Sequence, residues 1–289
     1  MKPKILILTP VFKDWQNLKM LLIKINMIFT KKIKQRFDLL VVDDDSRQKI
    51  NYKKFKFSKI NKLKIIKLSN NLGSQRAIAV GLKFIQKIYI KNYNVIIIDS
   101  DGQDNPSGIL KLLKKNNITK SPLAVRRGQR KEPWWFKIFY ELYCLTVFIF
   151  SLKKIRHGNY SLLSFSCVNK ILKDDGIWNA FPPTLSNNFK NLSFITIDRE
   201  KRYSGNSKMN FFGLFYHALR VFSVLKFRIL IFSIIYLIGL YIFLIEKYIL
   251  VFFFLAIFLF LFNLINFILS LNSKRNYLKN YKKIKVYGF

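Results

Sequence analysis

The sequence contains few cysteines and few histidines. Its 289 residues include only Cys144 and Cys167, and only His157 and His217. The cysteines have neither the spacing of metal ligands nor that of a disulfide framework, which favours a reducing compartment. Two histidines are too few for a histidine-rich metal site. Residues 1–8 lack an apolar run long enough for a signal peptide, so we expect the N-terminal domain to stay in the cytoplasm.

Acidic residues are also scarce. The chain has 15 Asp and Glu against 51 Lys and Arg, which gives a net charge of +36. A compositional bias of an AT-rich genome is one explanation, because Lys, Ile, Asn, Phe and Tyr are all abundant. Attraction to anionic lipid headgroups and phosphorylated substrates is another. We expect no nucleic-acid partner, because the lysines are scattered and no nucleic-acid motif occurs.

Two of the acidic residues directly follow an apolar run. Val95 to Ile98 has the character of a strand buried on both faces, and Asp99 and Asp101 come after it. Ligands of open α/β sheets bind beyond the carboxyl ends of such strands. Residues two apart in extended chain point the same way, so both carboxylates could face one Mg²⁺ or Mn²⁺ that holds a pyrophosphate. The segment therefore predicts a nucleotide-diphosphate site.

Apolar runs of strand length alternate with helical apolar spacing through the first hundred residues. A turn with a helix-capping serine precedes the second helical segment. This alternation predicts a parallel, doubly wound α/β sheet. The expected strands are 4–8, 38–42, 63–68 and 95–98, and the expected helices are 17–29 and 77–90.

Two long stretches near the C-terminus are apolar and contain no charge. Residues 229–245 span roughly 26 Å as a helix, enough for a slightly thin bilayer, and residues 248–271 are longer. Basic residues flank the pair, so the positive-inside rule places both ends in the cytoplasm. We expect an integral membrane protein with a two-helix hairpin and a basic cytoplasmic tail, 272–289, in the inner or plasma membrane if the source is bacterial. A buried hairpin of a soluble protein is the alternative.

Two further segments are apolar but carry charges. Residues 134–152 contain Lys137 and Glu141, and residues 209–228 contain Arg220. The charge-free part of the first is too short to cross a bilayer, and the second has the same character. Both are predicted to be amphipathic helices in the membrane interface, and the second lies next to the hairpin. Core-facing helices of a globular domain are the alternative.

Six short motifs follow one another along the chain. Gly73 permits an unusual backbone angle, and Ser74 opens a helix whose N–H groups can face an anion. Guanidinium groups bind phosphate oxygens bidentately. The motifs are Thr9-Pro-Val-Phe-Lys-Asp14, Val42-Asp-Asp-Asp-Ser46, Asn71-Leu-Gly-Ser-Gln-Arg-Ala77, Asp99-Ser-Asp-Gly-Gln-Asp-Asn-Pro106, Arg127-Gly-Gln-Arg130 and Arg199-Glu-Lys-Arg-Tyr-Ser-Gly-Asn-Ser-Lys208.

In this order the motifs resemble those of family 2 glycosyltransferases with the GT-A fold. More narrowly, they are similar to those of the polyprenyl-phosphate glycosyltransferases, the dolichyl-phosphate mannose synthase and bactoprenol glucosyltransferase group. The resemblance covers essentially the whole chain. It implies an α/β catalytic domain of GT-A type, Rossmann-like with a mostly parallel sheet, over residues 1–208. The juxtamembrane helix, 209–228, and the transmembrane hairpin, 229–271, would follow.

The resemblance also implies roles for individual residues. For Arg76, in the third motif, a solvated surface charge is the alternative. The cofactor is expected to be Mg²⁺ or Mn²⁺ at Asp99, Asp101 and Gln103. The nucleotide donor is expected at Pro10, Val11, Asp14, Asp43, Asp44, Asn71, Gly73, Ser74, Asp99 and Ser207. The catalytic residues are expected to be Asp101, Asn159 and the basic side chains of Arg127, Arg130, Arg202 and Lys208, which would position the acceptor phosphate.

The sequence departs from the family pattern at two places. Residues 157–161 stand where the family often has Gly-Asp-Phe-Arg, so Asn159 replaces an Asp and Ser161 an Arg. This suggests a different acceptor geometry or a different sugar. An acceptor phosphate is already anionic near pH 7 and needs little general-base help, which makes Asn159 tolerable. Gly102 replaces the usual Leu, and we expect a looser loop there.

The resemblance implies inverting, metal-dependent transfer from a nucleotide-diphosphate sugar to a polyprenyl phosphate of undecaprenyl or dolichyl type on the cytoplasmic leaflet. A single sugar is expected, because the Gln-x-x-Arg-Trp motif of processive synthases does not occur. One alternative is another acceptor, a membrane lipid or a lipid-linked saccharide. A second is a non-catalytic membrane scaffold that binds nucleotide sugar. Membrane lipids are expected partners in each case, and the hairpin could also pack against copies of itself.

Overall fold

The computed structural model describes residues 3–89, 92–119, 121–128, 134–205, 211–281 and 284–288, with only the backbone described for 134–136, 211 and 272–280. Its centre is a mixed sheet of eight strands in the order β7-β5-β6-β4-β1-β2-β3-β8. The strands are β1 (Lys4–Val11), β2 (Phe37–Asp43), β3 (Ile60–Lys67), β4 (Tyr93–Ile97), β5 (Leu123–Arg127), β6 (His157–Ser164), β7 (Ser193–Ile197) and β8 (Lys285–Gly288).

The middle of the sheet is parallel. Strands β4, β1, β2 and β3 run in one direction, whereas β6 and β8 pair antiparallel with their neighbours. The expected strands at 4–8, 38–42, 63–68 and 95–98 all lie in this parallel part, which confirms a mostly parallel α/β sheet. Their apolar runs are continuous because helices cover both faces of the sheet.

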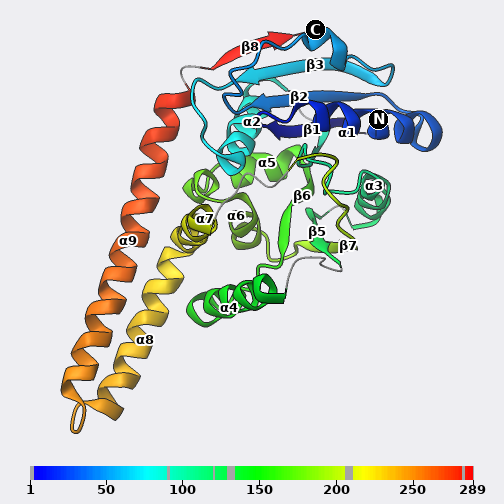
Figure 1. Ribbon diagram of the computed structural model, residues 1–289. Coiled ribbons are helices and arrows are strands. Elements are labelled where there is room, and N and C mark those ends of the chain that lie inside the picture. Colours follow the sequence, from blue (N-terminus) through cyan, green and yellow to red (C-terminus); the bar gives the residue numbers. More distant parts are fainter. Residues whose placement is uncertain are drawn as a thin grey trace.

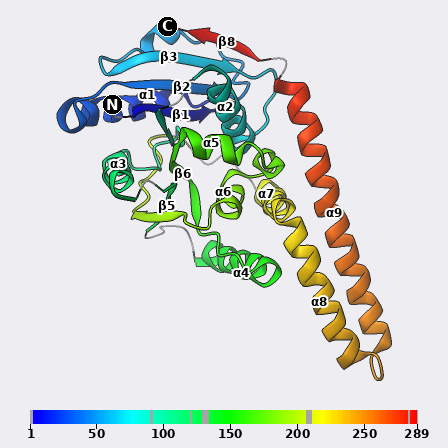
Figure 2. The same ribbon diagram turned by 180° about the vertical axis from the view of Figure 1, so that it is seen from behind.

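Each face of the sheet has its own apolar core. One face packs against α1 (Trp15–Ile28) and α3 (Gly108–Thr119) through residues such as Leu22 and Ile109. The other packs against α2 (Ser74–Ile88), α5 (Phe165–Ile171) and α6 (Phe181–Asn188). Figures 1 and 2 show these helices on opposite sides of the sheet. The expected helices at 17–29 and 77–90 correspond to α1 and α2.

The remaining helices lie at one end of the sheet and beyond it. Helix α4 (Trp134–Ser151) lies at the end opposite β8, and α7 (Phe211–Val224) leads into a hairpin of α8 (Lys226–Leu244) and α9 (Ile249–Tyr281) that projects away from the sheet (Figure 1). Helix α8 and residues 249–271 of α9 are long and apolar enough to cross a membrane. Only 11% and 17% of these stretches is buried, so most of their apolar surface faces outward.

The sequence analysis missed the last strand. Helix α9 continues to Tyr281, past the end of the expected span, and β8 then pairs antiparallel with β3 at the sheet edge. The Tyr287 ring centroid lies 5.5 Å from that of Tyr52, in the segment between β2 and β3. The C-terminal end of α9 therefore lies at the sheet, and residues 285–288 of the expected tail form a strand of the α/β domain.

Candidate active site

The carboxyl ends of β1, β2 and β4 form one rim of the sheet. Val11 pairs with Asp43 in the ladder, and the Asp44 N–H donates to the Val11 carbonyl at 2.8 Å. On the other side of β1, the Ile98 N–H donates to Leu8 at 3.1 Å. The motifs that begin near Pro10, Asp43 and Asp99 are therefore neighbours in space, because parallel strands end together at one edge.

Asp44 anchors the loop before α2. Its two carboxylate oxygens accept the N–H groups of Leu72 at 2.7 Å and Gly73 at 2.8 Å, and the Asn71 side chain also accepts the Gly73 N–H at 3.0 Å. Gly73 has φ +84°, a backbone angle that favours glycine. Burial raises the pKa of Asp44 to about 6 against the opposing effect of the two N–H bonds. Ser74 begins α2 and is exposed.

Asp43 has an unused acceptor. One carboxylate oxygen accepts the Ser46 N–H at 2.9 Å, and the other is buried with no hydrogen-bond partner among the described residues. Burial also raises the pKa of this carboxyl. A buried carboxylate oxygen without a donor is costly, so an N–H or O–H group of a ligand would be bound favourably there.

Three carboxylates crowd the end of β4. Asp104 accepts the Asp99 N–H at 3.2 Å, and Asp101 accepts the Gln103 N–H at 3.0 Å. Burial, together with the charges of Asp104 and Asp101, raises the pKa of Asp99, and a hydrogen bond from Asn159 and the charge of Arg127 oppose that rise. Such repulsion favours cations near these oxygens.

Two arginines of the segment after β7 supply positive charge to this rim. Arg202 donates to the carboxylate of Asp14 and also to that of Asp101, the latter at 3.4 Å. Arg199 donates to the side-chain oxygen of Gln103. The segment thus bridges the end of β1 and the loop after β4, although almost 190 residues separate Asp14 from Arg202.

Tyr203 closes the same segment over Gly102. Gly102 has φ +82°, and a Cβ there would lie 2.3 Å from the Tyr203 ring. The Tyr203 N–H donates to the Asp101 carbonyl at 3.3 Å, and the Lys24 ammonium lies 4.3 Å from the ring centroid. The expectation of a looser loop at Gly102 is therefore wrong, because the missing side chain makes room for Tyr203.

Asn159 connects Asp99 to α2. Its amide nitrogen donates to the two Asp99 oxygens at 3.1 and 3.3 Å, and its oxygen accepts from the Gln75 side chain at 2.8 Å. Gln75 in turn accepts the Phe181 N–H at 2.8 Å. An amide does not exchange protons at neutral pH, so Asn159 can orient Asp99 but cannot act as a base. The sequence analysis missed Gln75, whose only signal was a polar residue on the buried face of a helix.

Arg127 lies at the end of β5, on the other side of Asp99. Its charge lowers the pKa values of Asp99 and Asp104, and its Nε is buried without a hydrogen-bond partner among the described residues. Gly158 leaves room for it, since a Cβ there would lie 3.3 Å from a guanidinium nitrogen. The other expected basic and donor-binding residues, Arg130, Ser207 and Lys208, lie outside the described residues.

The oxygen-rich ligand set fits a hard divalent cation held jointly with a phosphate. Across the described ranges, no three His, Cys, Asp or Glu side chains cluster closely enough to hold a metal ion by themselves. Mg²⁺ and Mn²⁺ commonly take one or two carboxylates and complete their shell with phosphate and water oxygens. A cation at Asp101 and Gln103 would share these groups with Arg202 and Arg199.

Solved structures share this fold. The glucosyl-3-phosphoglycerate synthase of Mycobacterium tuberculosis, in complex with Mn²⁺, uridine diphosphate and glucosyl-3-phosphoglycerate, matches with a TM-score of 0.53 and 11% identity over 78% of this chain and 80% of that one. Its complex with uridine diphosphate matches with a TM-score of 0.51 and 12% identity over the same shares. At this identity the match shows the fold, which is of GT-A type.

Sequence comparison gives the family. A curated relative, an uncharacterised glycosyltransferase of Synechocystis sp. (strain PCC 6803), is 27% identical over 226 residues, which cover 74% of this chain and 66% of the relative. The chain thus spans just under two thirds of that protein's length. The model of glycosyl transferase family 2 matches residues 7–175, more than half of the chain. The chain belongs to glycosyl transferase family 2.

Proposed function

We propose that this protein transfers one sugar from a nucleotide-diphosphate sugar to a polyprenyl phosphate at a membrane surface. The observation that carries the proposal is the acidic rim, where Asp14, Asp99 and Asp101 converge from two strand ends and Arg202 bridges two of them. Carboxylates and arginines in one site can hold a metal–pyrophosphate group and the charge that develops on it. The adjacent apolar hairpin supports a lipid acceptor.

The donor would lie along the rim. The free oxygen of Asp43 would accept a hydrogen bond from the base or ribose, and Asp44 would keep the 71–74 loop in place beside it. Arg199 and Arg202 would contact the pyrophosphate. Mg²⁺ or Mn²⁺, held by Asp99, Asp101 and Gln103, would neutralise charge on the leaving nucleoside diphosphate.

The acceptor would approach from the Arg127 side of Asp99. Its phosphate is already ionised near pH 7, so an oxygen can attack the anomeric carbon directly while the bond to the nucleoside diphosphate breaks. Arg127 would hold that phosphate in line, with help from Arg130, Arg202 and Lys208. Asn159 would keep Asp99 oriented. Displacement from the opposite face inverts the anomeric carbon.

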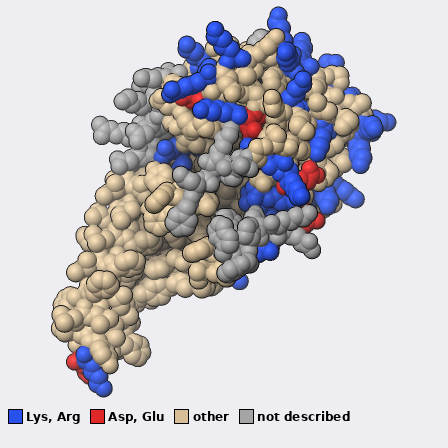
Figure 3. Space-filling view, in the orientation of Figure 1, with Lys and Arg blue, Asp and Glu red and all other residues tan. Residues whose placement is uncertain are grey.

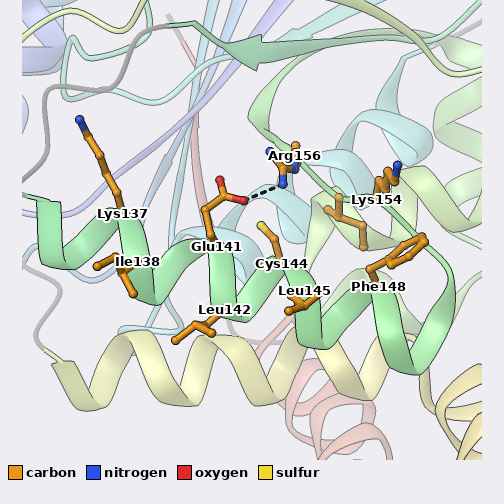
Figure 4. A pocket seen from close by; sticks show the side chains of 10 residues that line it. Lys137, Ile138, Glu141, Leu142, Cys144, Leu145, Phe148, Lys154 and Arg156 are labelled. Carbon is orange, nitrogen blue, oxygen red and sulfur yellow. Dashed lines mark hydrogen bonds and ion pairs between the residues drawn. The ribbon is translucent and has the colours of Figure 1, made fainter.

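The charge distribution supports placing this site at a membrane. Figure 3 shows basic side chains crowded over the sheet domain and a hairpin surface free of charge except at its tip. Helix α4 adds exposed apolar residues such as Phe139 and Leu142. A groove of about 950 Å³ beside α4 has mostly apolar walls, with the Arg156–Glu141 ion pair at 2.6 Å on one side (Figure 4). This mixture suits a helix at the bilayer interface.

We infer the membrane topology of the chain from this arrangement. The sheet domain and β8 would lie on the cytoplasmic side, because the chain enters and leaves the hairpin at the end that carries the basic residues. The pair Glu246–Lys247 at the tip would lie on the opposite side. Self-association through the exposed hairpin faces is compatible with this topology.

The test is a transfer assay with the full-length chain in detergent. Polyprenyl phosphate, Mg²⁺ or Mn²⁺ and a panel of nucleotide sugars are supplied, and products are identified by mass spectrometry. We expect one sugar per lipid phosphate and a loss of at least about 100-fold in Asp101→Asn. Glu246→Gln, an exposed carboxylate at the tip of the hairpin, is the matched control and should keep wild-type activity. Transfer to a neutral lipid or a lipid-linked saccharide, or full activity in Asp101→Asn, would contradict the proposal.

A further inference from the structure

Two arginines from distant parts of the chain converge on one carbonyl group. Arg76, in the first turn of α2, donates from Nε to the Trp178 carbonyl at 3.2 Å. Arg220, on α7, donates to the same oxygen at 3.2 Å. Like charges repel at this separation unless an anion lies between or beside them. Trp178 ends the short helical turn Asp175–Trp178, which contacts both α2 and α7, so its carbonyl holds the two guanidinium groups close together.

Arg220 is the more unusual of the two. Arg220 is only 7% exposed, and its Nε is buried without a hydrogen-bond partner among the described residues. Burial and the charge of Arg76 lower the pKa of Arg220 to about 10. A buried guanidinium that donates to a neutral carbonyl and leaves its Nε–H unpaired is costly, and an anion at this position would relieve the cost.

The guanidinium group of Arg220 lies close to the start of α2. One of its terminal nitrogens lies 3.9 Å from the point that a Cβ on Gly73 would occupy. Gly73 precedes Ser74, the first residue of this 15-residue helix. Helix N-termini present N–H groups and a positive dipole, which attract anions. The helix end and the unpaired buried guanidinium thus point independently to the same kind of ligand.

Helix α7 also connects this place to the reacting centre. His217, one turn before Arg220, has its pKa lowered to about 4 by burial and by the charges of Arg220 and Arg127. Arg127 acts in the same way on Asp99. Arg127 and Arg220 therefore both act on His217, and Arg127 also acts on Asp99. His217 itself adds no charge at neutral pH.

The two faces of α7 indicate where the anion comes from. Phe212 and Phe215 are 79% and 60% exposed, and α7 continues directly into the hairpin helix α8. The outer face of α7 is thus apolar, and Arg220 lies on the inner face, toward α2. A phosphate attached to a lipid in the membrane interface would reach Arg220 around this helix.

We propose that Arg76 and Arg220 form a phosphate-monoester site that binds the acceptor phosphate between α2 and α7. This inference rests on the proposed function and adds two residues to it. The two guanidinium charges match the charge of a phosphate monoester near pH 7. Binding there would hold the acceptor beside Arg127, from which it reaches the sugar on the donor.

The test is a binding measurement without turnover, made on the full chain in detergent. The probes are a two-isoprene prenyl monophosphate, the matching prenyl alcohol, inorganic phosphate and a nucleoside diphosphate with Mn²⁺. Arg220→Gln and Arg76→Gln are compared with Arg228→Gln, an arginine of α8 that donates to the Ser151 carbonyl at 3.4 Å. We expect each test variant to weaken prenyl monophosphate binding at least about tenfold, and Arg228→Gln to have no effect.

The other probes identify the source of the phosphate. Prenyl alcohol and nucleoside diphosphate should bind all variants as they bind the wild type. The binding of inorganic phosphate should weaken in parallel with that of the prenyl monophosphate. Unchanged prenyl monophosphate binding in both test variants overturns the site. Weakened nucleoside diphosphate binding instead assigns the arginines to the donor and also overturns it. If Arg220→Gln does not fold, Arg76→Gln, at a half-buried position, decides.

A transfer assay separates this inference from the proposed function. If the wild type transfers no sugar but the Arg220→Gln variant loses phosphate binding, the site is supported and the proposed activity is refuted. If the wild type is active and both variants, Arg220→Gln and Arg76→Gln, keep its KM for polyprenyl phosphate, the activity is supported and the site is refuted. We expect the KM for polyprenyl phosphate to rise at least about tenfold with the KM for the donor unchanged.

Discussion

The two sides of Asp99 are built in opposite ways. On one side, carboxylates at the ends of three parallel strands form an acidic rim, and arginines of the 199–205 segment neutralise part of it. On the other side, Arg127 of β5 acts on Asp99 and Asp104, while Arg76 of α2 and Arg220 of α7 share the Trp178 carbonyl. A metal-bound pyrophosphate suits the first side, and a lipid phosphate suits the second. Charge separation across one residue can thus order two anionic substrates in a single site.

Adding a carboxylate to the boundary between the two sides should have the largest effect on stability. In Asn159→Asp, a new charge faces Asp99 at about the distance of the present 3.1 Å hydrogen bond, and the Gln75 side-chain N–H keeps an acceptor. We expect the free energy of unfolding at pH 8 to fall by about 3–5 kcal/mol, because an uncompensated buried charge is created. Thermal unfolding checks this, and the loss should shrink at pH 5, where the acids can share protons.

The control for this change is Asn169→Asp. Asn169 is a half-buried amide that accepts from Gln86 at 3.1 Å, far from the rim, and should tolerate the charge far better. Equal losses in the two variants would mean that the environment of Asp99 is not specially acidic, and the contrast between the two sides would then fail.

The free energy of unfolding should depend on pH through Asp44, a residue of the rim. Its pKa is raised to about 6 by burial, so this carboxyl stabilises the folded state most at low pH, and that contribution is lost as the pH rises through 6. Because the ordinary pKa of an aspartate is 3.8, the loss amounts to at most about 3 kcal/mol. Unfolding midpoints of wild type and Asp44→Asn between pH 4 and 8 measure it. The variant should show the flatter profile, and parallel profiles would be inconsistent with a buried, protonated Asp44.

Removing the cation that bridges the rim should weaken donor binding. Arg202→Gln leaves Asp14 and Asp101 without their shared guanidinium, and we expect kcat/KM for the donor to fall about 10- to 100-fold. Arg47→Gln is the matched control, because Arg47 forms an exposed ion pair with Asp45 at 3.1 Å. A double-mutant cycle with Asp14→Asn should be strongly non-additive. Strict additivity would show that Arg202 and Asp14 have no coupling energy.

The smallest expected effect concerns the packing of Tyr203 on the loop after β4. In Gly102→Ala the added Cβ must displace the Tyr203 ring, and φ +82° is unfavourable for alanine, so we expect about 1–3 kcal/mol lower stability. Gly205→Ala isolates the backbone cost, because φ is +72° and a Cβ there meets no atom of the described residues within 4 Å. If both variants lose the same stability, the Tyr203 contact contributes nothing.

The acidic rim could be predicted from sequence because its signals are local. A continuous apolar run such as Val95–Ile98 predicts a buried strand, and the polar residues that end such strands must lie at one edge of a parallel sheet. Helices α1 and α2 and the apolar hairpin were predicted for the same reason, since periodicity and charge-free length are read directly from neighbouring residues.

The basic side could not be predicted in this way. Arg220 looks like a polar position on an amphipathic helix. Its meeting with Arg76, more than 140 residues away in sequence, depends on how α2 and α7 each pack against the 175–178 turn. Gln75 is important only because Asn159 and Phe181 lie beside it. Strand β8 is exposed at every residue and has no apolar periodicity, so only its pairing with β3 defines it.

The most direct test of the central claim is a balance of products in a single reaction. The full-length chain is incubated with polyprenyl phosphate, the active nucleotide sugar and Mn²⁺, and both the released nucleoside diphosphate and the glycosylated lipid are quantified. The account predicts one nucleoside diphosphate for each sugar attached through a phosphate oxygen, with inverted anomeric configuration. Release of nucleoside diphosphate with free sugar and no glycosylated lipid phosphate would contradict it.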